Sequence, residues 1–242
     1  MAETTTRVPI GQIMDATLRP QAPAPGFAVP PAERARPLAL PTWFIDRCRE
    51  AFLSISFPGP GRIIGITSSA PGEGKTTVAL GMTIAIATDT GEPTLLLECD
   101  LETSSDEVLG MTSGPGLGDW LEGDAPLRIV RMPPLDNAFL IPAGDGRPDP
   151  ARVFYRLSQG DLLAELQSEF ANIIIDLPPM VSVSYGTLAA KIAERFLVVA
   201  RYGSTRIEDL EETVAKLGPD RTCGIILNAY APKTPGWLRR IL

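Results

Sequence analysis

Residues 62–87 constrain the fold of this chain more than any other segment. The apolar run RIIGIT is followed by SSAPGEGKTT and then by the apolar stretch VALGMTIAIA. A strand, a glycine-containing loop, a Lys-Thr pair and a helix in this order form the pattern of a Walker A loop. Small residues let backbone N–H groups approach phosphates, and the helix N-terminus adds the positive end of its dipole. Ser69 stands where the strict pattern has glycine. The alternative to a phosphate-binding loop is a glycine-rich turn with a purely structural role.

The loop therefore predicts ATP and Mg²⁺ as cofactors. Lys75 is expected to reach the β and γ phosphates, and the hydroxyl of Thr76 is expected to coordinate magnesium. The predicted nucleotide-binding residues are Ser69, Pro71, Gly72, Glu73, Gly74, Lys75, Thr76 and Thr77, together with Asn228 at the end of the strand GIILN.

Carboxylates follow two further apolar strands. LLLECD ends in Glu98 and Asp100, and NIIID is a Walker B-like strand that ends in Asp176. We predict Lys75, Glu98 and Asp100 as catalytic residues, and Thr76, Asp100 and Asp176 as metal ligands. Acids at strand ends also cap helices or form turns, and that reading stays open for Glu98 and Asp176.

Short apolar runs alternate with helical periodicity from Trp43 onward, which predicts an α/β fold. We expect a P-loop NTPase three-layer sandwich with a mostly parallel central sheet and helices on both faces. The strands are expected at 62–67, 94–98, 138–141, 172–176, 195–200 and 224–227. The helices are expected at 75–87, 152–170, 184–194 and 205–217, the last with a capping-like region at 204–208.

Composition excludes several classes of function. The 242-residue chain has no histidine, so imidazole bases and His-ligated zinc are excluded. Its net charge of −7 disfavours nucleic acid as a partner. Its three cysteines lack CxxC spacing, which fits a reducing cytoplasm. We expect a flexible Pro/Ala-rich arm at 1–41, an ATPase domain at 42–230 and a short tail at 231–242, without a signal peptide or membrane span.

At these motifs the chain resembles the cytoplasmic bacterial tyrosine kinases, or BY-kinases, within the MinD and ParA-like P-loop ATPases. The resemblance spans about 44–230 and is carried by SSAPGEGKTT, LLLECDLE, GLGDWLEG, FLIPAG, IIIDLPP and GIILN. It implies that Lys75 and Thr76 grip phosphate and Mg²⁺, that Glu98 and Asp100 form the second acidic motif, and that Asp176 completes the metal shell. It also implies a membrane-embedded polysaccharide co-polymerase, or chain-length regulator, as partner, which would bring a cytoplasmic protein to the membrane.

The chain departs from the family pattern at several positions. Glu98 replaces the first aspartate of a DxD pair, Glu102 an arginine, and Tyr185 an aspartate. The family's ExxRxxR stretch corresponds to residues 46–52, where an acid and one arginine survive, so homo-oligomer assembly stays open. The family's terminal tyrosine cluster has no counterpart in residues 231–242.

These features favour a BY-kinase-like ATPase that regulates exopolysaccharide or capsule polymerisation and export, with tyrosine autophosphorylation weak or absent. Three alternatives remain open: an active tyrosine kinase on other proteins, a MinD or ParA-like positioning ATPase, and a scaffold without nucleotide chemistry. Ala70 and Pro71 stand where the positioning switches carry an early lysine, which counts against the second.

Overall fold

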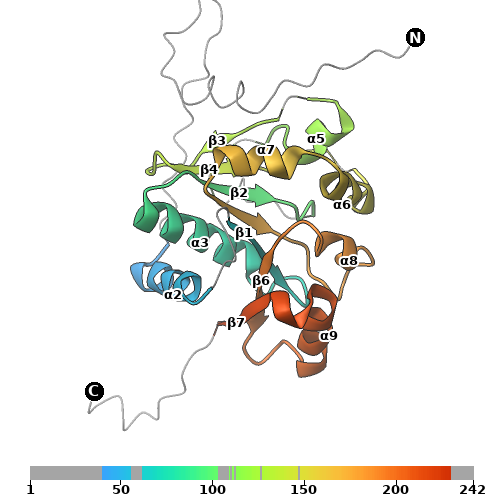
Figure 1. The fold of residues 1–242 in the computed structure, drawn as a ribbon. Helices are drawn as coiled ribbons and strands as arrows, with labels where there is room; N and C mark the ends of the chain where they lie inside the picture. Colours follow the sequence, from blue (N-terminus) through green and yellow to red (C-terminus); the bar gives the residue numbers. More distant parts are fainter. Residues whose placement is uncertain are drawn as a thin grey trace, which may run out of the picture.

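The computed structural model describes residues 40–55, 62–102, 109, 111, 113–125, 127–146 and 148–229. Nearly all of the predicted arm and the whole predicted tail lie outside these residues. A seven-stranded sheet crosses the described part in the order β3-β4-β2-β5-β1-β6-β7 (Figure 1). The strands are β1 (Arg62–Ser68), β2 (Thr94–Glu98), β3 (Val130–Arg131), β4 (Ala138–Ile141), β5 (Asn172–Asp176), β6 (Arg195–Arg201) and β7 (Thr222–Asn228).

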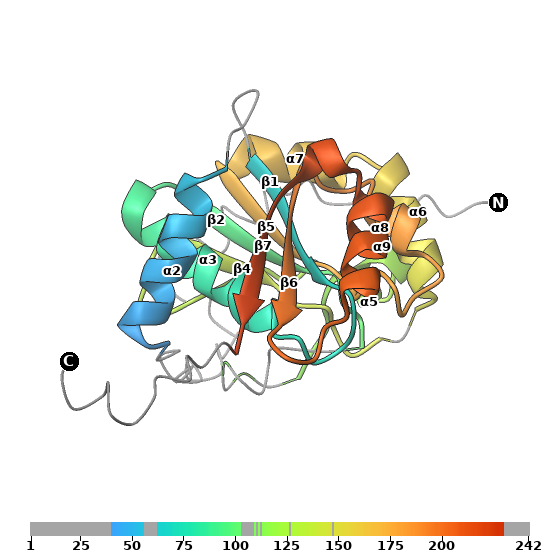
Figure 2. The same ribbon diagram turned by 90° about the horizontal axis from the view of Figure 1, so that it is seen from below.

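Helices cover both faces of this sheet, as the two perpendicular views show (Figures 1 and 2). One face is covered by α2 and α3, and the other by α5 to α9. The helices are α2 (Thr42–Leu53), α3 (Lys75–Thr90), α5 (Leu117–Glu122), α6 (Pro150–Gln159), α7 (Leu162–Glu169), α8 (Gly186–Ala189) and α9 (Ile207–Leu217), followed by the 3₁₀ turn η1 (Pro219–Arg221).

The middle strands are buried on both faces. In β5, Ile173 and Ile175 belong to the core beneath α5 to α9, whereas Ile174 belongs to the core beneath α2 and α3. All five residues of β5 are buried. A strand enclosed by helices on both sides has no face that must be polar, which explains its continuous apolar sequence.

The prediction of a mostly parallel sheet between helices is confirmed. Only the pair β3 and β4 is antiparallel, and every other pair of neighbouring strands is parallel. β1 lies between β5 and β6, so the loop that follows β1 emerges among the carboxyl ends of parallel strands. Ligands of open α/β sheets bind at that edge.

Two predicted helices are wrong in extent. The helix expected at 152–170 is two helices, because α6 ends before Gly160, whose backbone is extended, and α7 begins at Leu162. The helix expected at 184–194 is only α8, a single turn. After α8 the chain continues in i→i−3 hydrogen bonds, from Lys191 N to Leu188 O and from Ile192 N to Ala189 O, instead of α-helical ones.

The start of α9 also differs from the prediction. Its N-cap is Arg206, and no side chain caps the helix. The hydroxyl of Thr205, which falls in the expected capping region, bonds instead to the loop after β1. Among the described residues, no helix has the length and apolar content needed to cross a bilayer.

Candidate functional site

The loop between β1 and α3 owes its shape to glycine. Gly72 has φ +78° and Gly74 has φ +96°, a region that favours glycine because it has no Cβ. A Cβ on Gly74 would lie 2.1 Å from Nδ2 of Asn228. Ser69 needs no such freedom, because its φ is not positive. Among the described residues other than glycine, only Ala229 has a positive φ. The departure from the strict motif at Ser69 is therefore compatible with the loop conformation.

Lys75, the first residue of α3, forms a buried ion pair with Asp100. Its Nζ lies 2.5 Å from Oδ2 of Asp100, and the two side chains are 7% and 5% exposed. The other oxygen of Asp100 accepts a hydrogen bond of 3.3 Å from the backbone N of Glu102. A buried ammonium group needs an anionic partner, and Asp100 provides it in the protein without nucleotide.

Thr76 and Asp176 form the second polar pair of the site. Oγ1 of Thr76 donates to Oδ2 of Asp176 over 2.7 Å. Oδ1 of Asp176 is buried and has no hydrogen-bond partner among the described residues. Burial raises the pKa of Asp176 to about 7, although Lys75 and the Thr76 hydroxyl act in the opposite direction. A buried carboxylate oxygen without a partner is an open position for a cation.

The acidic strand ends converge, but Glu98 lies differently from Asp100. Glu98 is opposite Asp176 in the register of β2 and β5 and is 1% exposed. Its Oε2 accepts a hydrogen bond of 3.2 Å from the backbone N of Ala143, just beyond β4. Beside it, the N–H groups of Cys99 and Asp100 donate to the backbone O of Asp176 over 2.9 Å and 3.1 Å. The site thus joins β1, β2 and β5 at one edge of the sheet.

Two predicted nucleotide-binding residues, Glu73 and Asn228, contact the loop itself. The carboxylate of Glu73 accepts hydrogen bonds from Ser69 N and Ala70 N. Nδ2 of Asn228 donates to the backbone O of Glu73 over 2.9 Å. Sequence reasoning missed Thr205, which donates to Glu73, and Arg201, which donates to Gly72 O. No local pattern marks these two residues, since each lies about 130 positions away along the chain.

The donor set fits magnesium rather than a metal held by protein alone. The described residues include no cluster of three or more Asp, Glu, Cys or His side chains that could hold a metal ion. Mg²⁺ is usually bound by one or two carboxylates together with substrate phosphates. Thr76, Asp176 and Asp100 are all oxygen donors at the loop that would carry those phosphates.

Tyr185 packs against the opposite layer of the protein. Its ring stacks on Phe154 with the ring centres 5.6 Å apart. Burial, and to a smaller extent the carboxylate of Glu102, raises the pKa of Tyr185 to about 12. The hydroxyl therefore stays protonated at neutral pH.

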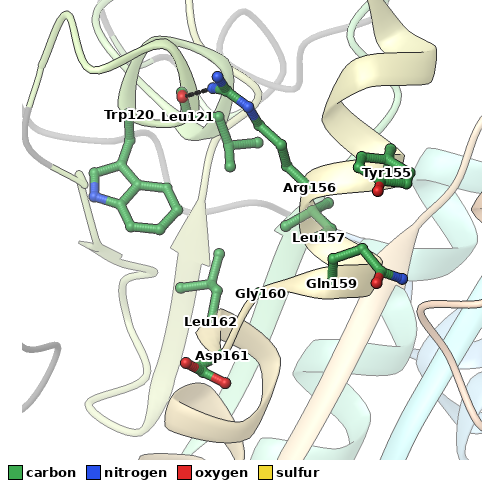
Figure 3. A pocket seen from close by; sticks show the side chains of 9 residues that line it. All are labelled: Trp120, Leu121, Tyr155, Arg156, Leu157, Gln159, Gly160, Asp161 and Leu162. Carbon is green, nitrogen blue, oxygen red and sulfur yellow. Dashed lines mark hydrogen bonds between the residues drawn. The ribbon is translucent and has the colours of Figure 1, made fainter.

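A separate hollow of about 280 Å³ lies between α5 and the helices α6 and α7 (Figure 3). Trp120 and Leu121 line it from α5, and Leu157 and Leu162 line it from α6 and α7. It contains none of the predicted nucleotide, catalytic or metal residues.

Comparison with known proteins agrees with this geometry. No protein-family model matches the chain. The tyrosine-protein kinase wzc of Salmonella typhimurium is 27% identical over 179 residues, which are 72% of this chain and 25% of that protein. The tyrosine-protein kinase CpsD of Streptococcus agalactiae is 28% identical over 182 residues, which are 72% of this chain and 78% of that protein.

Solved structures show the same relationship. The kinase domain of VpsO superposes with a TM-score of 0.65 at 28% identity, covering 77% of this chain and 96% of that one. The chain is thus similar in sequence and in fold to bacterial tyrosine-protein kinases, or BY-kinases. MinD from Pyrococcus horikoshii shares the fold more distantly, with a TM-score of 0.57 at 24% identity over 75% of this chain and 77% of that one.

The relatives differ from this protein in length. The chain spans about a quarter of wzc, which is matched over 25% of its length, but most of CpsD, which is matched over 78%. The activities and partners of the longer relatives therefore come to this chain only as proposals.

Proposed function

We propose that this protein binds Mg-ATP in the loop after β1 and regulates exopolysaccharide or capsule polymerisation and export as a BY-kinase-like ATPase. Its partner is a membrane-embedded polysaccharide co-polymerase, and its tyrosine autophosphorylation is weak or absent. The observation that carries the proposal is the buried ion pair of Lys75 and Asp100 next to the hydrogen-bonded pair of Thr76 and Asp176.

Nucleotide binding follows from how these pairs can rearrange. A triphosphate at the start of α3 gives the Lys75 ammonium group a second anionic partner, so Asp100 is released toward a cation. Asp176 already points an unpartnered oxygen into the buried site, and Thr76 holds its other oxygen in place. When bound, the magnesium ion would neutralise charge on the β and γ phosphates. A MinD relative of the same fold was solved with Mg-ADP, which supports this cofactor pair.

Weak phosphotransfer to tyrosine is supported by Glu98. Its carboxylate is hydrogen-bonded to Ala143 N on the β4 side of the sheet. This bond occupies one oxygen of the carboxylate that would have to accept the proton of a tyrosine hydroxyl. Among the described tyrosines, Tyr155 and Tyr202 are half exposed or more, at 58% and 50%, and neither lies in the loop.

The role in polysaccharide export comes from the relatives and needs its own test. CpsD and wzc are named as tyrosine-protein kinases. The role in capsule and exopolysaccharide synthesis is what the resemblance to the BY-kinases implies. In the organism that produces this protein, Lys75→Met should change the amount or chain length of surface polysaccharide, measured by gel electrophoresis. Normal polysaccharide together with misplaced division or partition machinery would favour the positioning ATPase instead.

Calorimetry with Mg-ATP tests the binding step. Wild type should bind, and Lys75→Met should lose at least about tenfold in affinity, the loss expected for a charge-assisted contact to phosphate. Lys191→Met is the matched control, because Lys191 is exposed and outside the site. No heat with wild type would leave only the scaffold hypothesis.

Labelled ATP distinguishes the kinase alternative. We expect wild type to give no more phosphotyrosine than Lys75→Met after incubation with Mg-ATP. Phosphotyrosine on the protein itself above that background contradicts the weak autophosphorylation, and transfer to an added protein favours the active kinase.

A further inference from the structure

Glu73 occupies an unusual position in the phosphate loop. It stands between Gly72 and Gly74, both with positive φ, yet its side chain is only 3% exposed. Its Oε2 accepts hydrogen bonds of 2.8 Å from Ser69 N and 3.1 Å from Ala70 N. The Glu73 carboxylate thus points toward the first residues of its own loop, and it supplies the negatively charged acceptor for their backbone amides.

Thr205 connects this carboxylate to the end of β6. Its Oγ1 donates to Oε1 of Glu73 and accepts a hydrogen bond of 2.7 Å from the backbone N of Arg201. The hydroxyl is therefore used as donor and acceptor at once, so it has one orientation. Because β6 pairs with β1, the turn after β6 lies beside the loop after β1.

Two more bonds from the same side hold the loop backbone. Nη1 of Arg201 donates to Gly72 O over 3.1 Å, and Nδ2 of Asn228 donates to Glu73 O over 2.9 Å. The carbonyl oxygens of the loop are thereby turned toward β6 and β7. Amides at the start of α3 have no acceptor within the helix and remain available to an anion.

We propose that Glu73 and Thr205 are positioning residues that preset the phosphate loop for the triphosphate, through the bond from the Thr205 hydroxyl to the Glu73 carboxylate. This inference rests on the proposed binding of Mg-ATP. Glu73 does not touch the nucleotide. It binds the amides of Ser69 and Ala70, and this holds the loop open around the amides that face the phosphates. Thr205 fixes the carboxylate in that orientation, so affinity for nucleotide depends on a residue outside the loop.

A pair of variants at Thr205 tests the proposal. Thr205→Val keeps the shape of the side chain but removes its hydroxyl, whereas Thr205→Ser keeps the hydroxyl. We expect Thr205→Val to raise the Kd for Mg-ATP about tenfold, as for the loss of one hydrogen bond to a charged group, and Thr205→Ser to stay within about twofold of wild type. Thr222→Val is the matched control, because it removes a hydroxyl that bonds Gly218 O, away from the loop.

Steady-state ATP hydrolysis separates positioning from general damage. If Thr205 positions the loop, Thr205→Val should raise KM for ATP about tenfold and change kcat less than about threefold, since the substitution does not alter the reacting groups. A merely structural loss would lower the folded fraction and reduce kcat at constant KM. If Thr205→Val does not fold, Glu73→Gln provides the same test, because it keeps the volume and weakens both amide bonds.

The outcomes are distinct. Wild type that binds Mg-ATP while Thr205→Val binds equally well overturns this inference alone. Equal losses in Thr205→Ser and Thr205→Val also overturn it, because the hydroxyl would not be the cause. Failure of wild type to bind Mg-ATP overturns the proposed function, and this inference with it.

Discussion

Replacement of Asp176 by asparagine should stabilise the metal-free protein, although it removes a proposed magnesium ligand. The carboxylate of Asp176 is buried, and one of its oxygens has no partner among the described residues. Burial raises the pKa of this group from 3.8 to about 7. Without a cation, the folded protein therefore holds a charge in an unfavourable place at neutral and alkaline pH.

The number of protons bound by the folded and the unfolded state determines how the free energy of unfolding changes with pH. Between about pH 4 and pH 7 the unfolded chain has released the proton of Asp176 while the folded protein retains it. The unfolded state then binds fewer protons, so the free energy of unfolding falls as pH rises through this range. The difference of roughly three pKa units corresponds to about 4 kcal/mol once the pH is well above 7. At pH 5 less than half of this cost is present.

Asparagine cannot ionise, so it avoids this cost at every pH. We expect Asp176→Asn to gain stability over wild type from pH 5 to pH 8, with the gain larger at pH 8 by about 2–3 kcal/mol. Urea denaturation in a chelator, without nucleotide, measures the free energy of unfolding at both values. Asp136→Asn is the control, because Asp136 is 93% exposed.

A difference between Asp176→Asn and wild type that is the same at pH 5 and pH 8 would refute this reasoning. So would a loss of stability at both values, because it would mean that the buried carboxylate is favourable in the absence of metal.

Three further variants test the packing and the ion pair. Gly74→Ala should abolish binding of Mg-ATP, since a side chain at φ +96° costs about 1–2 kcal/mol and its Cβ would lie 2.1 Å from Asn228; calorimetry measures the loss. Gly81→Ala should lower the free energy of unfolding by about 1–3 kcal/mol, because its Cβ would lie 2.6 Å from Phe44 and 2.7 Å from Cys48; urea denaturation measures it. Asp100→Asn should destabilise the nucleotide-free protein by about 2–4 kcal/mol because Lys75 loses its buried anion; nucleotide should restore part of this, as seen by thermal denaturation.

The strands that sequence predicts best are those enclosed on both faces. The predicted bounds of β2, β4 and β5 agree with the structure, and every residue in these strands is buried. A run of three or four apolar residues in a chain of this pattern is readily accommodated as a strand buried on both faces of the sheet. The two-residue strand β3 has no such run and pairs antiparallel at the edge, so no periodicity reveals it.

The helices were less predictable, because helical periodicity continues across breaks. Apolar residues from Val153 to Phe170 repeat as on one helix face, and only Gly160 marks the change of direction. Ile192 and Ala193 read as the end of a helix in sequence, but they are buried in the turn that leads into β6. In both cases, tertiary packing overrides the local pattern.

The site shows the same division between what is local and what the fold brings together. Lys75 and Thr76 follow from one contiguous motif, and their partners Asp100 and Asp176 follow from the rule that parallel strands end at one edge. Neither the motif nor this rule predicts Thr205, because Thr205 contacts Glu73 only when β6 lies next to β1. No short segment of the sequence indicates the order of the strands. The residues that we propose to hold the nucleotide and the metal can thus be found by motif. The residue that we propose to position the loop becomes visible only once the order of the strands is known.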